Sequence, residues 1–291
     1  FSLKKIVLGT AQFSGNYGVT RKNSFLTKNE AHKILKTLLT KKLRHLDTSI
    51  DYENSLKKIN SFNFNNWQIT TKMDPKKLDF SSEQNLYLSV ENQIKLIKQN
   101  SSIKTIKNLL IRNSNMILTP KGKILYKVLK KIKRNKLIIN FGYSIYNFKN
   151  LEKIIINFRP DLIQCPYNVF DRRIENIKIK KLLKKKKIKI QARSIFLQGV
   201  LLKKIDQLPK FFHKWKKLFL NFENLIKINK LTALSLCFNF VNNNKDIDEI
   251  LIGVQNNKEL KEILNIELKR KILMSKDLFN PSLKLIDPTK W

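Results

Sequence analysis

The feature that most constrains the fold of this chain is an alternation of short apolar runs with longer helical patterns. The runs are rich in β-branched residues, and the stretches between them carry apolar residues three and four positions apart, as a helix with one buried face does. Strands that alternate with helices pair in parallel through right-handed crossovers. The runs from which we predict strands are Lys5–Gly9, Leu43–Asp47, Gln68–Lys72, Asn108–Arg112, Leu137–Ser144, Asp161–Pro166, Ile188–Arg193 and Glu249–Val254.

About eight strand–helix units favour a closed barrel over an open sheet. The 291 residues of the chain suit such a barrel, which needs roughly 250. No Gly-rich or Pro-rich linker divides the sequence, so we expect the α/β class and a TIM (β/α)8 barrel as a single domain of residues 1–291. No G-x-G-x-x-G follows the first run, which gives a Rossmann dinucleotide site no support. Residues 201–248 are too many for one helix, and we expect a loop with helices there.

Three helix starts can be predicted from capping residues. Thr27 and Ser81 each stand three positions before a Glu or Gln, which is the spacing of a capping box. Thr119 precedes a proline, as an N-cap does when proline takes the first helical position. These signals predict that helices start where three of the apolar-periodic stretches begin.

The charge balance is unusual, because 59 Lys and Arg stand against 22 Asp and Glu, a net charge of +37. A surplus of this size raises nucleic acid or an anionic membrane as a partner. The basic residues are spread along the chain, however, and Lys, Asn and Ile are abundant together, as a mutational bias toward A and T would produce. We therefore expect no specific nucleic-acid partner and no membrane partner, and keep a basic nucleic-acid-binding protein as a less favoured alternative.

Cysteine usage and hydropathy argue against metal-binding, disulfide-rich and membrane-spanning proteins. Cys165 and Cys237 form no C-x-x-C pair and no Cys/His cluster, so we expect no metal site and no disulfide framework. No apolar run reaches the roughly 18–20 residues of a membrane span. The opening residues show no signal-peptide pattern, so we expect none. We accordingly expect a cytoplasmic location.

The ends of the predicted strands are polar, although a plain core would be apolar there. Barrel enzymes carry their active sites at the carboxyl ends of their strands, so these residues are the first candidates for a site. In chain order the strand ends hold Thr10 to Gln12, Asp47 to Tyr52, Lys72, Arg112, Ser144, Gln164, Arg193 with Ser194, and Gly253.

The segment R-H-L-D-T-S-I-D-Y, residues 44–52, resembles the aldo-keto reductase pattern R-H-I-D-T-A-x-x-Y. The segment I-T-T-K, residues 69–72, is similar to the third strand of that family. The resemblance implies that Tyr52 is a general acid supported by Lys72 and Asp47. The chemistry agrees: hydride reduction of a carbonyl leaves an alkoxide that needs a proton, an ammonium favours the phenolate, and a buried ammonium needs a carboxylate. We expect an oxidoreductase that reduces an aldehyde or ketone to an alcohol.

The fourth strand departs from the family pattern. It reads L-L-I-R-N-S where the family commonly has L-L-I-H-N-P, so Arg112 stands in the place of a histidine. Arg112 could donate to the substrate carbonyl or bind a substrate carboxylate bidentately. Alternatively it fills the pocket, and the chain is a catalytically impaired barrel that binds a dinucleotide without turnover. His45 does not match the family histidine, and we expect it to be a hydrogen-bonded core residue.

Further segments resemble the family, and all but the one at 167–173 belong to its cofactor site. They are F-G-Y-S at 141–144, L-I-Q at 162–164, Y-N-V-F-D-R-R at 167–173, Q-A-R-S-I-F-L-Q-G at 191–199 and the segment I-G-V-Q-N-N-K-E that starts at residue 252. The resemblance implies NADP(H), with NAD(H) as the alternative because Gln255 replaces a basic residue and only Lys258 could substitute for it. The implied cofactor residues are Thr10, Ala11, Gln12, Ser144, Gln164, Arg193, Ser194, Phe196, Leu197, Gln198, Gly199, Gly253, Val254, Gln255, Asn256, Glu259 and Glu262.

Two of these segments carry further expectations. Arg193 stands where many family members have a tyrosine stacked on the nicotinamide, and its planar guanidinium could stack similarly. The R-S-x-F-L-Q-G form, with L-G-T-A-Q-F at 8–13 and N-Y-G at 16–18, is similar to a branch met in surface-polysaccharide and sugar biosynthesis. The substrate is therefore expected to be a small carbonyl compound, such as a sugar derivative, and the chain a monomer or weak oligomer.

Overall fold

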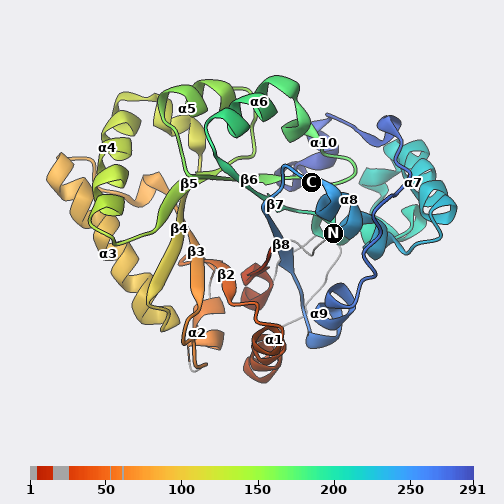
Figure 1. The fold of residues 1–291 in the computed structure, drawn as a ribbon, viewed down its shortest axis with the longest axis horizontal. Helices are drawn as coiled ribbons and strands as arrows, with labels where there is room; N and C mark the ends of the chain where they lie inside the picture. Colours follow the sequence, from red (N-terminus) through yellow and green to blue (C-terminus); the bar gives the residue numbers. More distant parts are fainter. Residues whose placement is uncertain (1–4, 16–25, 53, 61) are drawn as a thin grey trace.

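The computed structural model describes residues 5–15, 26–52, 54–60 and 62–291. Its eight strands pair in parallel in chain order, and β8 pairs with β1 to close the barrel (Figure 1). The predicted α/β class and TIM (β/α)8 barrel are confirmed. The N-Y-G segment at 16–18 lies outside the described residues. The strands are β1 (Lys5–Gly9), β2 (His45–Ser49), β3 (Gln68–Met73), β4 (Thr105–Ile111), β5 (Asn140–Ser144), β6 (Leu162–Pro166), β7 (Lys189–Arg193) and β8 (Glu249–Gly253).

Helices surround the barrel (Figure 1), and several of them bury one apolar stripe. The stripe of α4, for example, consists of apolar residues three and four apart that are fully buried. Among the described residues, no helix is long and apolar enough to cross a membrane. The helices are α1 (Lys28–Thr40), α2 (Ser55–Ile59), α3 (Glu83–Ser101), α4 (Pro120–Arg134), α5 (Leu151–Asn157), α6 (Ile177–Lys185), α7 (Lys216–Ile228), α8 (Ala233–Asn243), α9 (Asn257–Leu264) and α10 (Leu283–Ile286).

Two of the three predicted helix starts are confirmed. The hydroxyl of Thr27 accepts from the N–H of Glu30 at the start of α1, and the hydroxyl of Thr119 caps α4 in the same way. The prediction for Ser81 is wrong by one residue, because Ser82 caps α3. The N–H of Ser81 instead donates to the carboxylate of Asp79 at 2.9 Å, which places Ser81 in the turn before the helix.

Strand boundaries differ from the prediction at two places that matter for the site. β2 continues past Asp47 to Ser49, so that Asp47 lies within the strand and not at its end. The buried hydroxyl of Thr48 accepts a hydrogen bond from Thr10 of the first strand end at 2.7 Å, which stabilises this polar continuation. β5 starts only at Asn140, because the N–H of Leu137 still donates to the last turn of α4.

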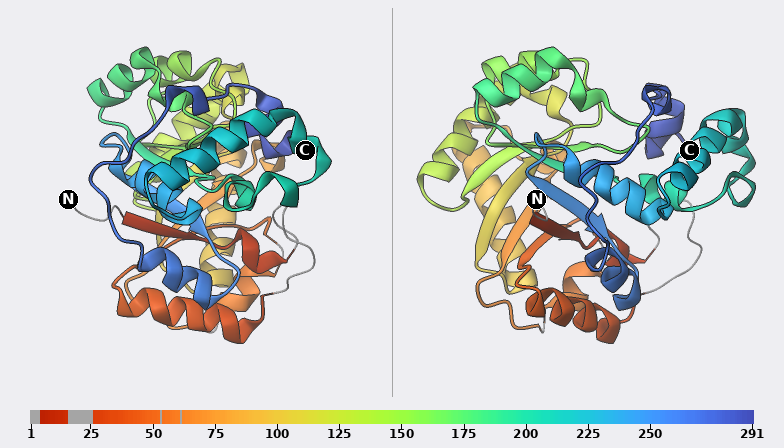
Figure 2. Two further views of the ribbon diagram at one scale, coloured as in Figure 1. Left: turned by 90° about the vertical axis from the view of Figure 1, so that its right-hand side faces the viewer. Right: turned by 45° about the vertical axis from the view of Figure 1, so that its right-hand side comes forward.

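The segment between β7 and β8 contains the expected loop and helices. Three 3-10 turns, Leu197–Leu202, Ile205–Gln207 and Lys210–Trp215, lead into α7 and α8. Figure 2 shows α7 together with the C-terminal segments at one side of the barrel. The ring of Phe212 contacts that of Trp291 there, with 5.1 Å between centroids.

Candidate active site

A buried ion pair lies at the carboxyl end of the barrel. The ammonium of Lys72, from β3, contacts Oδ1 of Asp47, from β2, and both side chains are almost fully buried. Oδ2 of Asp47 accepts a second hydrogen bond from Nε2 of Gln164 at 2.7 Å. Burial acts to lower the pKa of Lys72, but the Asp47 carboxylate outweighs it and raises that pKa above its ordinary value. Lys72 is therefore a cation inside the barrel.

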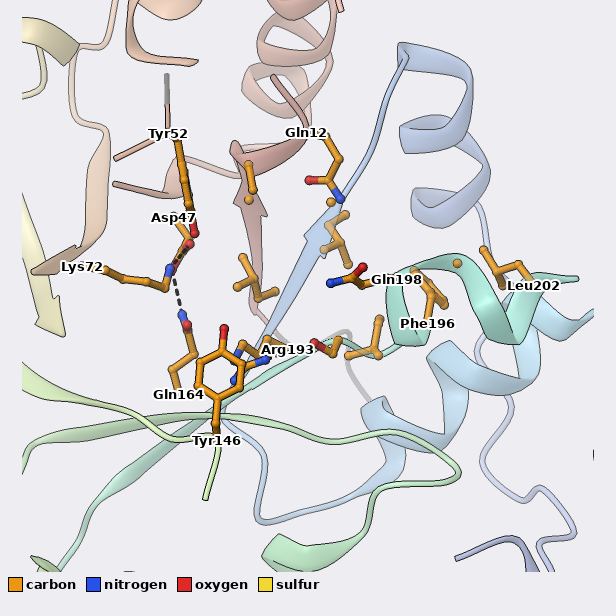
Figure 3. Close-up of a pocket in the computed structure, with 18 residues that line it drawn as sticks. Gln12, Asp47, Tyr52, Lys72, Tyr146, Gln164, Arg193, Phe196, Gln198 and Leu202 are labelled. Atoms are coloured by element: carbon orange, nitrogen blue, oxygen red, sulfur yellow. Dashed lines mark hydrogen bonds and ion pairs between the residues drawn. The ribbon is translucent and has the colours of Figure 1, made fainter. Parts of the chain in front are cut away.

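Tyr52 lies over this ion pair. It follows β2 in a tight turn, in which its N–H donates to the carbonyl of Ser49 at 3.0 Å. The Lys72 ammonium is 5.8 Å from the centroid of the Tyr52 ring. Figure 3 shows the hydroxyl end of Tyr52 pointing toward Lys72 and Asp47. The structure thus brings together the three residues for which the sequence predicted acid chemistry.

A cavity opens beside this trio at the mouth of the barrel (Figure 3). Twelve of the predicted site residues line it, and six further residues complete its wall. They are Ala11, Gln12, Asp47, Tyr52, Lys72, Gln164, Arg193, Ser194, Phe196, Gln198, Gly199 and Gly253, together with Gly9, Tyr146, Ile195, Leu202, Leu251 and Ile252.

The side-chain amide of Gln164 has a fixed orientation on the floor of the cavity. Its Nε2 donates to Asp47 and also to Oε1 of Gln191 at 2.6 Å, and Gln191 in turn donates to Glu249 at 2.7 Å. Its Oε1 is buried and has no hydrogen-bond partner among the described residues. A buried acceptor of this kind needs a donor. The amide N–H of a nicotinamide carboxamide would supply one, so the residue fits the cofactor that the sequence predicted.

Arg193 is the second buried residue of the cavity that has an unused hydrogen-bonding group. Its two terminal nitrogens donate to the carbonyl of Ile145 at 3.0 Å and to the hydroxyl of Ser194 at 3.2 Å. Its guanidinium carbon lies 3.8 Å from the centroid of the Tyr146 ring. Its Nε has no hydrogen-bond partner within the described part of the chain. The tyrosine covers one face of the guanidinium, and stacking of a ligand ring is left to the other face.

The loop that follows Arg193 carries backbone strain. Ser194, Leu197 and Gln198 have φ angles of 55°, 47° and 53°, in the left-handed region that glycine prefers, and Gly199 follows with 89°. Strained backbone of this kind clusters at functional sites, where surrounding structure holds it in place. Three of these four residues line the cavity.

Gly253 ends β8 on the opposite wall. A Cβ at this position would lie 2.0 Å from Nε2 and 2.2 Å from Oε1 of Gln12. Glycine therefore lets the amide of Gln12 lie over the strand end, from which it faces the cavity (Figure 3).

Arg112 is placed differently from the substrate-facing position that the sequence suggested. It is absent from the described residues that line the cavity. One terminal nitrogen donates to the hydroxyl of Ser49 at 3.0 Å, and the other pairs with the carboxylate of Asp51 at 3.3 Å. The guanidinium carbon is 5.8 Å from the centroid of the Tyr52 ring. Arg112 thus contacts the turn that carries Tyr52.

The start of α9 is also occupied from within the chain. N–H groups at the start of a helix can bind a phosphate. In the structure the N–H of Gln255 donates to the carboxylate of Glu259 at 2.9 Å, and that of Asn257 donates to Glu30 at 2.7 Å. Two carboxylates at this helix start oppose a further anion.

Eight other predicted site residues lie outside the cavity lining. Ser144 is buried beside it, because the strand register sets this residue opposite Gln164. The remaining seven form the first strand end, one core position and the start of α9. They are Thr10, Leu197, Val254, Gln255, Asn256, Glu259 and Glu262.

Sequence reasoning missed Tyr146 and five apolar or glycine lining residues. Tyr146 lies two positions after Ser144 at the end of β5, so the same search of strand ends could have found it. The five others are Gly9, Ile195, Leu202, Leu251 and Ile252. Apolar residues at strand ends carry no signal that distinguishes a cavity wall from the core.

Comparison with known proteins gives a family. The model of the aldo/keto reductase family matches residues 5–275. No curated protein matches the sequence. An aldo-keto reductase from Bacillus halodurans, in its holo form, has a similar fold, with a TM-score of 0.71 at 12% identity over 96% of this chain and 91% of that chain. A glycerol dehydrogenase from Gluconobacter oxydans gives a TM-score of 0.65 at 16% identity over 92% and 88%.

Proposed function

The chain belongs to the aldo/keto reductase family, and from this premise we propose that it reduces an aldehyde or ketone to an alcohol with Tyr52 as the proton donor. Membership makes the chain an oxidoreductase of carbonyl substrates, and the family generally uses NAD(P)H. The proposal adds the acid, its supporting residues and the residues that receive the cofactor. A small neutral carbonyl compound, such as a sugar derivative, is the proposed substrate, and a monomer or weak oligomer the proposed state.

The observation that carries the proposal is the buried ion pair of Lys72 and Asp47 beneath Tyr52. The alkoxide formed by hydride addition must be protonated, and the phenol of Tyr52 borders the cavity where this would happen. The cationic Lys72 stabilises the phenolate that Tyr52 becomes when it gives up its proton. Asp47 keeps Lys72 charged in a site with little water, because a buried ammonium without a carboxylate would tend to lose its proton.

Cofactor binding is assigned to the floor and walls of the cavity. A bound reduced nicotinamide would supply the hydride. Gln164 would accept from its carboxamide, and the strained loop after Arg193 would line the rest of the dinucleotide. We propose NADP(H) as the cofactor. NAD(H) is the alternative, because the carboxylates of Glu30 and Glu259 already accept from N–H groups at the start of α9, which could otherwise bind a phosphate.

Arg112 supports a second candidate function. Since Asp51 and Ser49 occupy its guanidinium, Arg112 does not take the substrate-orienting part of the family histidine. The alternative is a barrel that binds a dinucleotide without turnover. It differs from the first proposal in one respect that can be measured, namely the consumption of bound reduced cofactor.

Substitution of Tyr52 by phenylalanine tests the proposed acid. Tyr52→Phe removes the proton donor but leaves the ring and the ion pair below it. We expect the rate of reduced-cofactor consumption to fall by about 10²–10⁴-fold, while the dissociation constant of the cofactor stays within about twofold, in steady-state kinetics and fluorescence titration. Lys95→Gln serves as the control, because Lys95 is an exposed lysine that pairs with Glu91 of the same helix, α3. A Tyr52→Phe enzyme with the wild-type rate would exclude Tyr52 as the acid.

A further inference from the structure

Arg193 differs from the other cations of the site in its charge balance. Lys72 pairs with Asp47, and Arg112 pairs with Asp51. No carboxylate of the described residues forms an ion pair with Arg193, although this residue is only 8% exposed. Its hydrogen bonds go to a carbonyl and a hydroxyl, which carry no net charge. A buried cation of this kind keeps its full electrostatic effect on whatever lies next to it.

The position of Arg193 sets what that neighbour would be. Gln164 and Arg193 come from the adjacent strands β6 and β7, both line the cavity, and each has an unpartnered buried polar atom. Figure 3 shows Gln164, Tyr146 and Arg193 on one side of the cavity and Tyr52 on the other. A nicotinamide whose carboxamide is held by Gln164 and whose ring faces a substrate at Tyr52 would lie against Arg193.

We propose that Arg193 makes the cavity discriminate between the two oxidation states of the dinucleotide and favours the reduced one. The oxidised nicotinamide ring carries a positive charge, and the reduced ring carries none. Arg193 repels the oxidised ring, whereas the other charges of the two forms are identical. The inference rests on the proposed function, because it requires that the nicotinamide enters this cavity. Its consequence is that the reduced form occupies the cavity when both forms are present and that the oxidised product leaves readily.

The experiment is a comparison of dissociation constants for the reduced and oxidised forms of both NAD and NADP, measured by calorimetry on the wild type, Arg193→Gln and Arg193→Lys. We expect the wild type to bind the reduced form more tightly, and Arg193→Gln to lower the ratio of the two affinities about tenfold or more. A tenfold change corresponds to about 30 mV in the potential of the bound two-electron couple. Arg193→Lys keeps the charge and should keep most of the ratio.

A matched control removes a cation that does not line the cavity. Arg172 pairs with Glu175 at 2.7 Å. Arg172→Gln should therefore leave the affinity ratio unchanged, which separates the local effect of Arg193 from the large positive charge of the whole chain. Near-ultraviolet circular dichroism of each variant shows whether the fold is retained.

Each outcome has a distinct meaning. If the affinity ratio of Arg193→Gln equals that of the wild type, or if both oxidation states lose affinity equally, the inference is wrong while the proposed function stands. Equal loss would assign Arg193 to a phosphate of the dinucleotide. If the wild type binds none of the four dinucleotides, the proposed function fails and the inference fails with it.

Discussion

At the scale of single residues, one ion pair gives the cavity its chemistry. A buried salt bridge adds little net stability, because the cost of desolvating both charges offsets their attraction. The pair of Lys72 and Asp47 is better understood as a means of keeping one positive charge next to Tyr52. The sequence predicted these three residues because they lie at strand ends or in the turn after one and because their segments resemble the aldo-keto reductase pattern. The rotamers that bring them together could not be read from the sequence.

Arg112 shows where residue-level prediction reaches its limit. The sequence predicted it as the last residue of the fourth strand, and it directly follows β4. Its partner, however, is Asp51, which follows a different strand. Burial would raise the pKa of Asp51, but a hydrogen bond from Lys77 and the charge of Arg112 lower it below its ordinary value. Such long-range pairing depends on the register of neighbouring strands, and a single sequence does not specify it.

His45 gives a prediction about pH and stability. It is buried, and its ring nitrogens lie 2.8 Å from the hydroxyl of Thr70 and 3.3 Å from the ammonium of Lys107. Burial lowers its pKa from 6.5 to about 4. Between pH 6.5 and about pH 4, His45 therefore binds a proton in the unfolded chain but not in the folded one. The free energy of unfolding should therefore fall as the pH falls through this window, by about 3 kcal/mol from this residue.

Denaturant unfolding at a series of pH values measures this contribution. The carboxylates of the chain also titrate at acidic pH, so the informative quantity is the difference between the wild type and His45→Gln. We expect this difference to change across the window from about pH 6.5 to 4 and to stay constant above it. A difference that does not depend on pH would mean that His45 titrates alike in the folded and unfolded states.

At the scale of elements, the order of strands and helices could be predicted and their ends only in part. The period of the apolar residues identified every strand, because a buried parallel strand and a one-sided helix differ strongly in pattern. The ends depend on hydrogen bonds that compete locally. Ser81 donates its N–H to Asp79 and leaves the cap of α3 to Ser82, and the last turn of α4 retains Leu137. The residues of the cavity wall could not be predicted from the sequence either, because they come from the ends of seven strands.

The packing of β5 on β6 gives a prediction about stability. A Cβ at Gly142 would lie 2.0 Å from the carbonyl oxygen of Leu162, which is backbone and cannot move without breaking the strand pairing. We expect Gly142→Ala to lower the free energy of unfolding by about 3 kcal/mol or more in urea denaturation. Gly9→Ala is the matched control in β1, where the nearest atoms would be 3.3 Å away, and should cost about 1 kcal/mol or less. Equal losses in the two variants would contradict this account of the strand contact.

At the scale of the whole molecule, the net charge of +37 surrounds the site with a positive field. Such a field attracts anions in general and raises the rate at which an anionic dinucleotide reaches the cavity. Basic residues occur in the last turns of α4 and α6, on different sides of the barrel (Figure 1). That the chain has no specific nucleic-acid partner stays a prediction.

The central claim is that this barrel binds a nicotinamide dinucleotide and uses it to reduce a carbonyl. The most direct test is titration of the wild-type protein with NADPH and NADH by fluorescence, followed by addition of aldehydes and keto-sugars while the absorbance of the reduced cofactor is recorded. The account predicts saturable binding of at least one dinucleotide and its oxidation by at least one neutral carbonyl compound. Binding without oxidation of any compound would favour the non-catalytic barrel, and binding of neither dinucleotide would contradict the claim.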